Sequence, residues 1–229
     1  MRAVAVLTVF ANHLFGWPSG GFVGVDVFFV LSGFFITGLL IRERKAKRKL
    51  SFQKFYIRRV KRIIPSAVLV LVVTAVAGSL LFTASRARDT ILDALYAAVF
   101  ASNWHFEAIG ADYFQSTRPP SPIQHYWSLS IEEQFYFVWP VLLVAIFAIT
   151  RQLRHSGAKR AGEWGMVAAM SLVVGASFGW AMYLSAVDGN AAYFSTFTRV
   201  WELGVGALVA ICAPWLRNLP AGCGQSWLI

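Results

Sequence analysis

The chain has 229 residues, of which 57% are hydrophobic and only 14% are charged. Soluble domains carry about 45–50% apolar and about 25% charged residues, so this composition excludes an ordinary soluble domain and indicates a membrane protein. The net charge of +10 is local, because residues 42–62 hold eleven of the 21 basic residues against one acid, Glu43. A nucleic-acid binder would carry its basic residues along a soluble face, whereas this cluster lies between two long apolar segments.

Six apolar segments approach the ~20 residues that a helix needs to cross a bilayer. They cover residues 2–17, 21–41, 64–84, 133–150, 165–186 and 199–216. A cleavable signal peptide is a poor interpretation of the first segment, because His13 interrupts it and a second apolar segment follows almost at once. The predicted fold class is therefore all-α, a polytopic transmembrane helical bundle of about six spans.

The distribution of basic residues predicts the orientation of these spans. By the positive-inside rule, residues 42–62 and the shorter basic loop around Arg151 to Arg160 are expected to face the cytoplasm. Residues 85–131 then form a long loop on the outer face, and a loop of that length usually carries structure or function. Within it we expect a helix at the membrane interface over 90–106 and an irregular segment over 110–122.

Ionisable residues inside the spans are costly in lipid and mark candidate functional positions. In the first span, Arg2 and His13 are eleven residues apart and therefore project from one face of a helix. If the first two spans form a hairpin, Asp26 lies at a depth similar to that of His13. Structural alternatives stay open: His13 can be hydrogen-bonded to a nearby carbonyl, and Asp26 can stabilise a helix start.

Two further groups of charged residues stand at the outer ends of later spans. Glu132 and Glu133 begin the fourth span, where Ser130 and Glu133 also fit a capping box. Arg199 and Glu202 begin the sixth span and are spaced for an ion pair within one helix. We therefore expect His13, Asp26, Glu132, Glu133, Arg199 and Glu202 to converge on the outer side, with Arg2 and the basic segment facing the cytoplasm.

This two-sided arrangement favours group transfer across the bilayer. Cytoplasmic arginines would hold an anionic donor, while outer acids and bases would act on an acceptor. One alternative is a transporter whose intramembrane charges line a pathway. Another is a membrane protein that serves as a noncatalytic partner.

Five blocks of sequence resemble motifs of one family. They are Arg2-x10-His13, the apolar and glycine-rich block 21–34, the basic block 55–65, the block His-Tyr-Trp-Ser-Leu-Ser-Ile-Glu-Glu-Gln-Phe-Tyr over 125–136, and the block 194–203. In that order they are similar to the acyltransferase-3 family, which are integral-membrane enzymes that O-acylate cell-surface polysaccharides, peptidoglycan and lipids.

The resemblance implies a reaction and a set of site residues. The expected donor is an acyl-CoA such as acetyl-CoA, used as a co-substrate, and the expected acceptor is a hydroxyl of a cell-surface carbohydrate or lipid, for example in lipopolysaccharide. His13 is expected to be the general base. The candidate residues are His13, Asp26, Glu132 and Glu133 for catalysis, Arg2, Arg58, Arg59 and Arg62 for the donor, and Trp127, Ser128, Arg199 and Glu202 for the acceptor.

Other expectations complete this interpretation. The chain is expected to lie in the plasma or inner membrane among lipids, with neither a bound cofactor, nor a metal, nor a nucleic-acid partner. Arg58, Arg59 and Arg62 could equally contact phospholipid headgroups, and Gly33 is expected to allow close helix packing. Because family members commonly have about ten spans, residues 1–229 are interpreted as one acyltransferase-3-like domain, truncated at both ends and lacking its C-terminal spans.

Overall fold

The computed structural model describes residues 2–47, 51–111, 119–155 and 161–216, and all regular elements in these ranges are helical. This confirms the all-α prediction. The chain divides into two compact units: Met1–Arg48, Ile146–Val174 and Glu202–Ile229 form unit 1, and Lys49–Ala145 and Gly175–Trp201 form unit 2. Each unit is described by itself.

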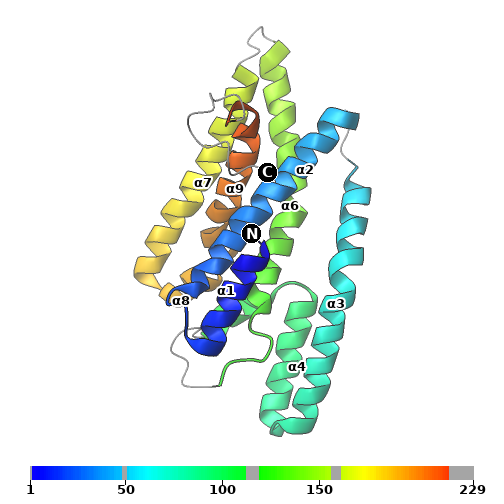
Figure 1. Cartoon of the computed structure of the whole chain (residues 1–229), viewed down its shortest axis with the longest axis vertical. Coiled ribbons are helices and arrows are strands. Elements are labelled where there is room, and N and C mark those ends of the chain that lie inside the picture. Colours follow the sequence, from blue (N-terminus) through cyan, green and yellow to red (C-terminus); the bar gives the residue numbers. More distant parts are fainter. Residues whose placement is uncertain (1, 48–50, 112–118, 156–160, 217–229) are drawn as a thin grey trace. The chain divides into compact units, whose positions relative to one another are not determined.

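Unit 1 opens with the predicted helical hairpin. Helix α1 (Arg2–Phe15) is joined through the short 3-10 helix η1 (Gly21–Val23) to helix α2 (Gly24–Lys47), which packs against α1 (Figure 1). The Asn12 amide donates to the Pro18 carbonyl at 2.9 Å and ties the end of α1 to the turn. Glycine is needed at position 24, since a Cβ there would come within 2.6 Å of the Ala5 carbonyl oxygen.

A second close approach in unit 1 joins α2 to helix α9 (Thr196–Leu216). A Cβ added at Gly33 would overlap the Leu203 carbonyl, and a Cβ added at Gly206 would overlap the Val30 carbonyl. Small residues let the backbones of two membrane helices come together in this way. The expectation that Gly33 serves helix packing is therefore confirmed.

Unit 2 is built around helix α3 (Phe52–Leu81) and the first part of helix α6 (Tyr126–His155). The two helices run antiparallel, because the Tyr56 hydroxyl donates to the Phe137 carbonyl at 2.7 Å and the Tyr126 hydroxyl donates to the Ala67 carbonyl at 3.1 Å. Helix α4 (Ala84–Ala98) turns back along α3 (Figure 1). Their shared apolar core contains Ala67, Leu71, Ala94, Ala97, Ile123 and Tyr126.

The predicted outer loop is largely helical. In place of one helix over 90–106, the chain forms α4 and then α5 (Ser102–Ala108), separated by a break at Phe100, whose φ is 55°. Of the irregular stretch predicted over 110–122, residues 112–118 lie outside the described residues. After α6, the chain continues through helix α7 (Ala161–Val187) and the short helix α8 (Gly189–Phe194) to the start of α9.

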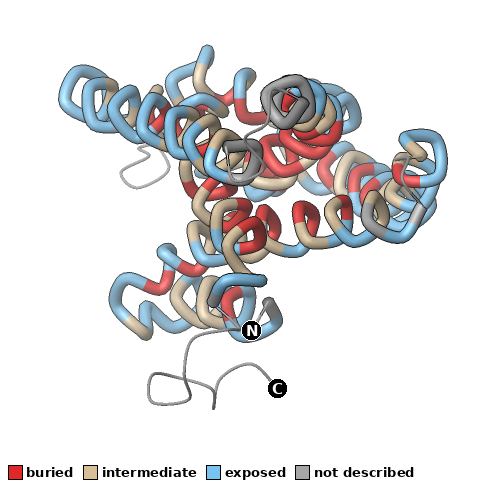
Figure 2. The backbone as a smooth tube through the Cα atoms, turned by 90° about the horizontal axis from the view of Figure 1, so that it is seen from above, coloured by how far each residue is buried: buried red, intermediate tan, exposed pale blue. Residues whose placement is uncertain are grey.

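The described residues contain five helices long and apolar enough to cross a membrane: Gly21–Arg44, Phe52–Leu81, Tyr126–Ala148, Trp164–Val187 and Thr196–Trp215. They agree with five of the six predicted spans. The remaining predicted span, the first one over residues 2–17, corresponds to helix α1. This helix has 14 residues and is shorter than the ~20 that span a bilayer. Buried and exposed stretches alternate along these helices (Figure 2), and α3 and α7 are the least buried of the five.

Candidate functional site

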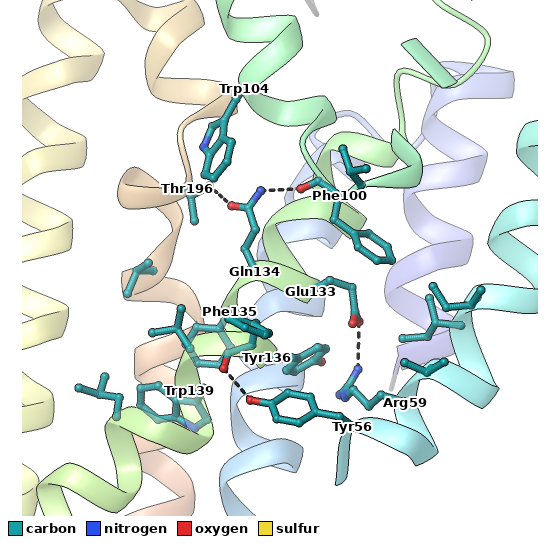
Figure 3. Close-up of a pocket in the computed structure, with 18 of the residues that line it drawn as sticks. Tyr56, Arg59, Phe100, Trp104, Glu133, Gln134, Phe135, Tyr136, Trp139 and Thr196 are labelled. Carbon is teal, nitrogen blue, oxygen red and sulfur yellow. Dashed lines mark hydrogen bonds and ion pairs between the residues drawn. The ribbon is translucent and has the colours of Figure 1, made fainter. Parts of the chain in front are cut away.

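A cavity of about 670 Å³ lies within unit 2. It is an open cavity bordered by α3, the segment from the end of α4 into α5, α6 and the start of α9 (Figure 3). Most of its wall is aliphatic and aromatic. The lining residues are Tyr56, Arg59, Val60, Ile63, Ile64, Val99, Phe100, Trp104, Glu133, Gln134, Phe135, Tyr136, Phe137, Val138, Trp139, Leu142, Thr196, Phe197 and Val200.

The charged part of this wall is an ion pair between α3 and α6. Arg59 donates from Nη1 to Glu133 Oε1 at 3.2 Å, and the two side chains are 21% and 14% exposed. The same guanidinium lies 3.2 Å from the centre of the Tyr136 ring (Figure 3). A cation over an aromatic face and beside a carboxylate is held by both contacts.

Glu132 lies on the same turn of α6 but has a different environment. It is 6% exposed, and the Tyr136 hydroxyl donates a hydrogen bond to its Oε1. The two neighbouring glutamates therefore face different partners, Tyr136 for Glu132 and Arg59 for Glu133.

A ring of three hydrogen bonds joins α5, α6 and α9 beside the cavity. Gln134 Nε2 donates to Asn103 Oδ1 at 2.9 Å, Asn103 Nδ2 donates to Thr196 Oγ1 at 3.0 Å, and Thr196 Oγ1 donates to Gln134 Oε1 at 2.6 Å. Asn103 is fully buried. Because each member both donates and accepts, the polar atoms of the ring are satisfied without water.

Phe100 contributes its ring to the cavity from a strained backbone position. Its φ of 55° lies in the left-handed region, which bulky residues rarely adopt. The turn is held because Gln134 Nε2 donates to the Phe100 carbonyl at 2.7 Å and the amide of Ala101 donates to the Tyr96 carbonyl at 2.9 Å. Glycine usually occupies such a position after a helix, and here an aromatic side chain lines the cavity instead.

The structure brings Arg59 and Glu133 together, although the sequence predicted them on opposite sides of the membrane. The predicted third span began at residue 64, whereas α3 begins at Phe52 and its basic first half runs beside α6. Arg58 and Arg62, the other donor candidates of this helix, are exposed on α3.

The acceptor candidates of unit 2 gather where α6 and α9 begin. Trp127 is 2% exposed and packs on Tyr193, with ring centres 4.6 Å apart. Arg199 donates from Nε to the Tyr193 carbonyl at 3.3 Å, and its guanidinium lies 5.7 Å from the Trp127 ring. The Ser128 hydroxyl donates to the His125 carbonyl at 3.2 Å.

The capping box predicted from Ser130 and Glu133 is wrong. Helix α6 begins at Tyr126, five residues before Ile131, which that box would make the first helical residue. The Ser130 hydroxyl is hydrogen-bonded to the Ser102 hydroxyl at 2.7 Å instead, and Glu133 faces Arg59.

His13 and Asp26 belong to unit 1. The exposed His13 ring places Nδ1 2.9 Å from the Val9 carbonyl, which supports the structural alternative weighed for it. Asp26 lies in the first turn of α2, as its helix-start interpretation predicted. Gly24, two residues before Asp26, approaches Ala5 and Val9 of α1.

Two other predicted residues also lie in unit 1. Arg2 is the first residue of α1, and its side chain lies outside the described part of the structure. Glu202 is 1% exposed on α9. The predicted outer cluster is therefore divided between the two units, with Glu132, Glu133 and Arg199 in unit 2.

Sequence reasoning missed several residues of the site. Gln134, Tyr136 and Thr196 stood within quoted motifs but received no role. Phe100 and Asn103 lay within the predicted interfacial helix 90–106 and received no role either. A partly buried pair of His105 and Asp93, joined at 2.9 Å between α5 and α4, was missed as well. The one sequence signal for Asn103 is a polar residue on the apolar side of the predicted helix 90–106.

Helices, apolar spans and intramembrane charges together define a multi-pass membrane protein. Among the described residues, none of the His, Cys, Asp and Glu side chains gather in a group suited to hold a metal ion. No solved structure matches the chain.

The chain belongs to the acyltransferase-3 family, described as an acyltransferase domain, which it matches over residues 1–222. It is 36% identical over 221 residues to the peptidoglycan O-acetyltransferase OatA of Listeria monocytogenes, covering 96% of this chain and 34% of that protein. It is 37% identical over 218 residues to the putative peptidoglycan O-acetyltransferase YrhL of Bacillus subtilis, covering 95% and 33%. The chain thus spans about a third of the length of these curated relatives.

Proposed function

We propose that this chain forms the membrane part of an O-acetyltransferase. The acetyl group would come from acetyl-CoA and pass to a hydroxyl of a cell-envelope carbohydrate or lipid. The observation that carries the proposal is the family match over residues 1–222, together with O-acetyltransferase relatives at 35–37% identity. The membrane would be the inner or plasma membrane, with the basic end of α2 and the basic start of α3 on its cytoplasmic side.

His13 is proposed as the general base of this reaction. The Val9 carbonyl can only accept, so a hydrogen bond to Nδ1 requires the ring proton to be on Nδ1. Nε2 is then the basic nitrogen, which is the form a general base needs. Nε2 would take the proton of the acceptor hydroxyl as the hydroxyl oxygen attacks the thioester carbonyl. The C–S bond would then break, and coenzyme A would leave as the thiol with the proton that His13 returns.

The remaining candidates have proposed roles in the same reaction. Arg2, Arg58 and Arg62 would neutralise the phosphates of the donor, since guanidinium groups suit bidentate phosphate contacts. Arg59, the fourth donor candidate of the sequence, is instead paired with Glu133 in the cavity wall. Asp26, Glu132 and Glu133 would orient groups of the site, and Trp127, Ser128, Arg199 and Glu202 would contact the acceptor.

The test is transfer of radiolabel from acetyl-CoA to cell-envelope material in membranes that contain this chain. His13→Ala should lower the transfer by at least about 100-fold, the usual contribution of a general base. Leu14→Ala, which alters the exposed neighbouring side chain of α1, should leave transfer unchanged. Full transfer by His13→Ala would exclude His13 as the base, and no transfer by the unaltered chain would contradict the proposed activity.

A further inference from the structure

We infer that the cavity of unit 2 binds the hydrocarbon chain of a lipid phosphate, with the phosphate at Arg59. The inference goes beyond acetyl transfer, because an acceptor hydroxyl does not itself specify a site for a lipid phosphate in this cavity. It can also be tested without turnover.

The size and lining of the cavity argue for a hydrocarbon chain. Its volume of about 670 Å³ lies in the range of sites that enclose a whole small-molecule ligand. An acetyl group, with three heavy atoms, would leave almost all of that space empty. A long apolar chain would fill it and would contact Ile63, Phe135 and Leu142.

The polar side chains of the wall argue against a sugar in the cavity. The side chains of Gln134 and Thr196 are hydrogen-bonded within the three-residue ring, and the Tyr56 hydroxyl donates to the Phe137 carbonyl. A carbohydrate brings many hydroxyl groups, and each of them costs free energy when buried without a partner. An apolar chain brings none.

The rim of the cavity carries exposed apolar side chains on three membrane helices. Val60 of α3 is 54% exposed, and Phe137 of α6 and Phe197 of α9 are each 69% exposed. All three lie within candidate membrane spans. A chain that leaves the bilayer can therefore enter the cavity while staying among apolar groups.

Arg59 supplies a binding group for the head of such a lipid. A guanidinium has five N–H donors, and in the described structure one of them is hydrogen-bonded, to Glu133 Oε1. The ring of Tyr136 covers one face of the guanidinium and fixes its plane (Figure 3). The other donors at its edge fit two oxygens of a phosphate without loss of the Glu133 contact.

Two sources offer a phosphate joined to a hydrocarbon chain: a single-chain lipid phosphate of the bilayer and a long-chain acyl-CoA of the cytoplasm. We assign the cavity to the bilayer lipid, because a nucleotide would add polar groups that the apolar wall does not bind. Competition with CoA distinguishes the two sources.

The experiment measures binding of radiolabelled geranylgeranyl phosphate to the purified chain in phosphatidylcholine nanodiscs. Val60→Trp, which places a large ring at the cavity, should weaken binding about tenfold or more, since displacing two methylene groups already costs that much. Val72→Trp changes a similarly exposed valine of α3 away from the cavity and should leave binding unchanged.

The headgroup arm uses Arg59→Gln combined with Glu133→Gln, so that neither charge is left without its partner. This variant should also bind about tenfold more weakly, the usual effect of losing a hydrogen bond to a charged group. Lys61→Gln, at an exposed position of the same helix outside the cavity wall, should bind normally. Geranylgeraniol, which lacks the phosphate, should bind more weakly than the phosphate to the unaltered chain.

Four results would overturn the inference. Normal binding by Val60→Trp, or equal weakening by Val72→Trp, would place the lipid elsewhere. Equal affinity for geranylgeraniol and geranylgeranyl phosphate would show that the site does not bind the phosphate. Displacement of the label by free CoA would identify the cavity as a donor site. Acetyl transfer that fails while lipid binding behaves as expected would contradict only the proposed function.

Discussion

Several charged side chains of unit 2 are held by specific partners. Arg59 is fixed by Glu133 and the Tyr136 ring, and Glu107 of α5 is influenced by Asp188 before α8. Partial burial, and then the negative charge of Asp188, raise the pKa of the Glu107 carboxyl above its usual range. Asp188 has a second role, because its Oδ1 accepts from the Ala191 amide at 2.9 Å and caps α8.

The raised pKa of Glu107 predicts a pH-dependent stability. A carboxyl with a higher pKa in the folded state binds its proton more tightly there, so stability is greatest at low pH and falls as the pH rises from about 4.3 through the folded pKa. Asp188→Asn should reduce this fall, because Asn caps a helix as well as Asp does but carries no charge. The measurement is thermal unfolding in detergent from about pH 4 to pH 7.

Two variants control this experiment. Glu107→Gln should remove the contribution of this group to the pH dependence altogether. Asp188→Ala should also reduce it but lower stability by about 1 kcal/mol at every pH, because the helix cap is lost. A pH profile that Glu107→Gln leaves unaltered would show that the dependence arises elsewhere.

At the scale of elements, the apolar helices were predictable and their register was not. Long apolar segments fix where membrane helices form, so five predicted spans agree with the structure. The contact of Arg59 with Glu133 depends on the register of α3 against α6. That register is set by side-chain hydrogen bonds of Tyr56 and Tyr126. Thus each residue could be selected from the sequence, but their pairing could not.

The close approach of α2 and α9 leads to a stability prediction. Gly206→Ala should destabilise the protein by roughly 1–3 kcal/mol or more, because the added methyl group would overlap the Val30 carbonyl and force the helices apart. Gly175→Ala, where nothing lies within 4 Å of the new Cβ, should be neutral or stabilising by up to about 1 kcal/mol. Thermal midpoints of the two variants in detergent make the comparison.

The opposite order of stability would contradict this packing. If Gly206→Ala were as stable as Gly175→Ala, the contact between α2 and α9 would have to be looser than the structure describes.

At the scale of the whole molecule, the sequence predicts an orientation that the fold does not itself fix. The basic residues cluster between the second and third predicted spans, and the segment with α4 and α5 belongs to the opposite side by the positive-inside rule. Charge asymmetry acts during membrane insertion, so it is readable from sequence. The arrangement of the helices depends on packing between distant segments, which composition and hydropathy do not encode.

Cysteine labelling tests the orientation. In a variant lacking Cys212 and Cys223, Ile109→Cys at the exposed end of α5 should react with a membrane-impermeant maleimide in intact cells. Ala46→Cys, exposed near the end of α2, should react only after permeabilisation. Labelling of Ala46→Cys in intact cells would reverse the predicted orientation.

The three-residue ring of Asn103, Gln134 and Thr196 also bears on biosynthesis. Its members are 31, 62 and 93 residues apart in pairs, so the ring cannot close until the start of α9 has been synthesised. Until then, Gln134 and Asn103 present amide groups without the Thr196 hydroxyl in an apolar environment, which is costly. A nascent chain that stops before α9 would thus expose amide groups of Asn103 and Gln134 that Thr196 binds in the longer chain. Cellular quality control recognises such unpaired polar groups in an apolar environment.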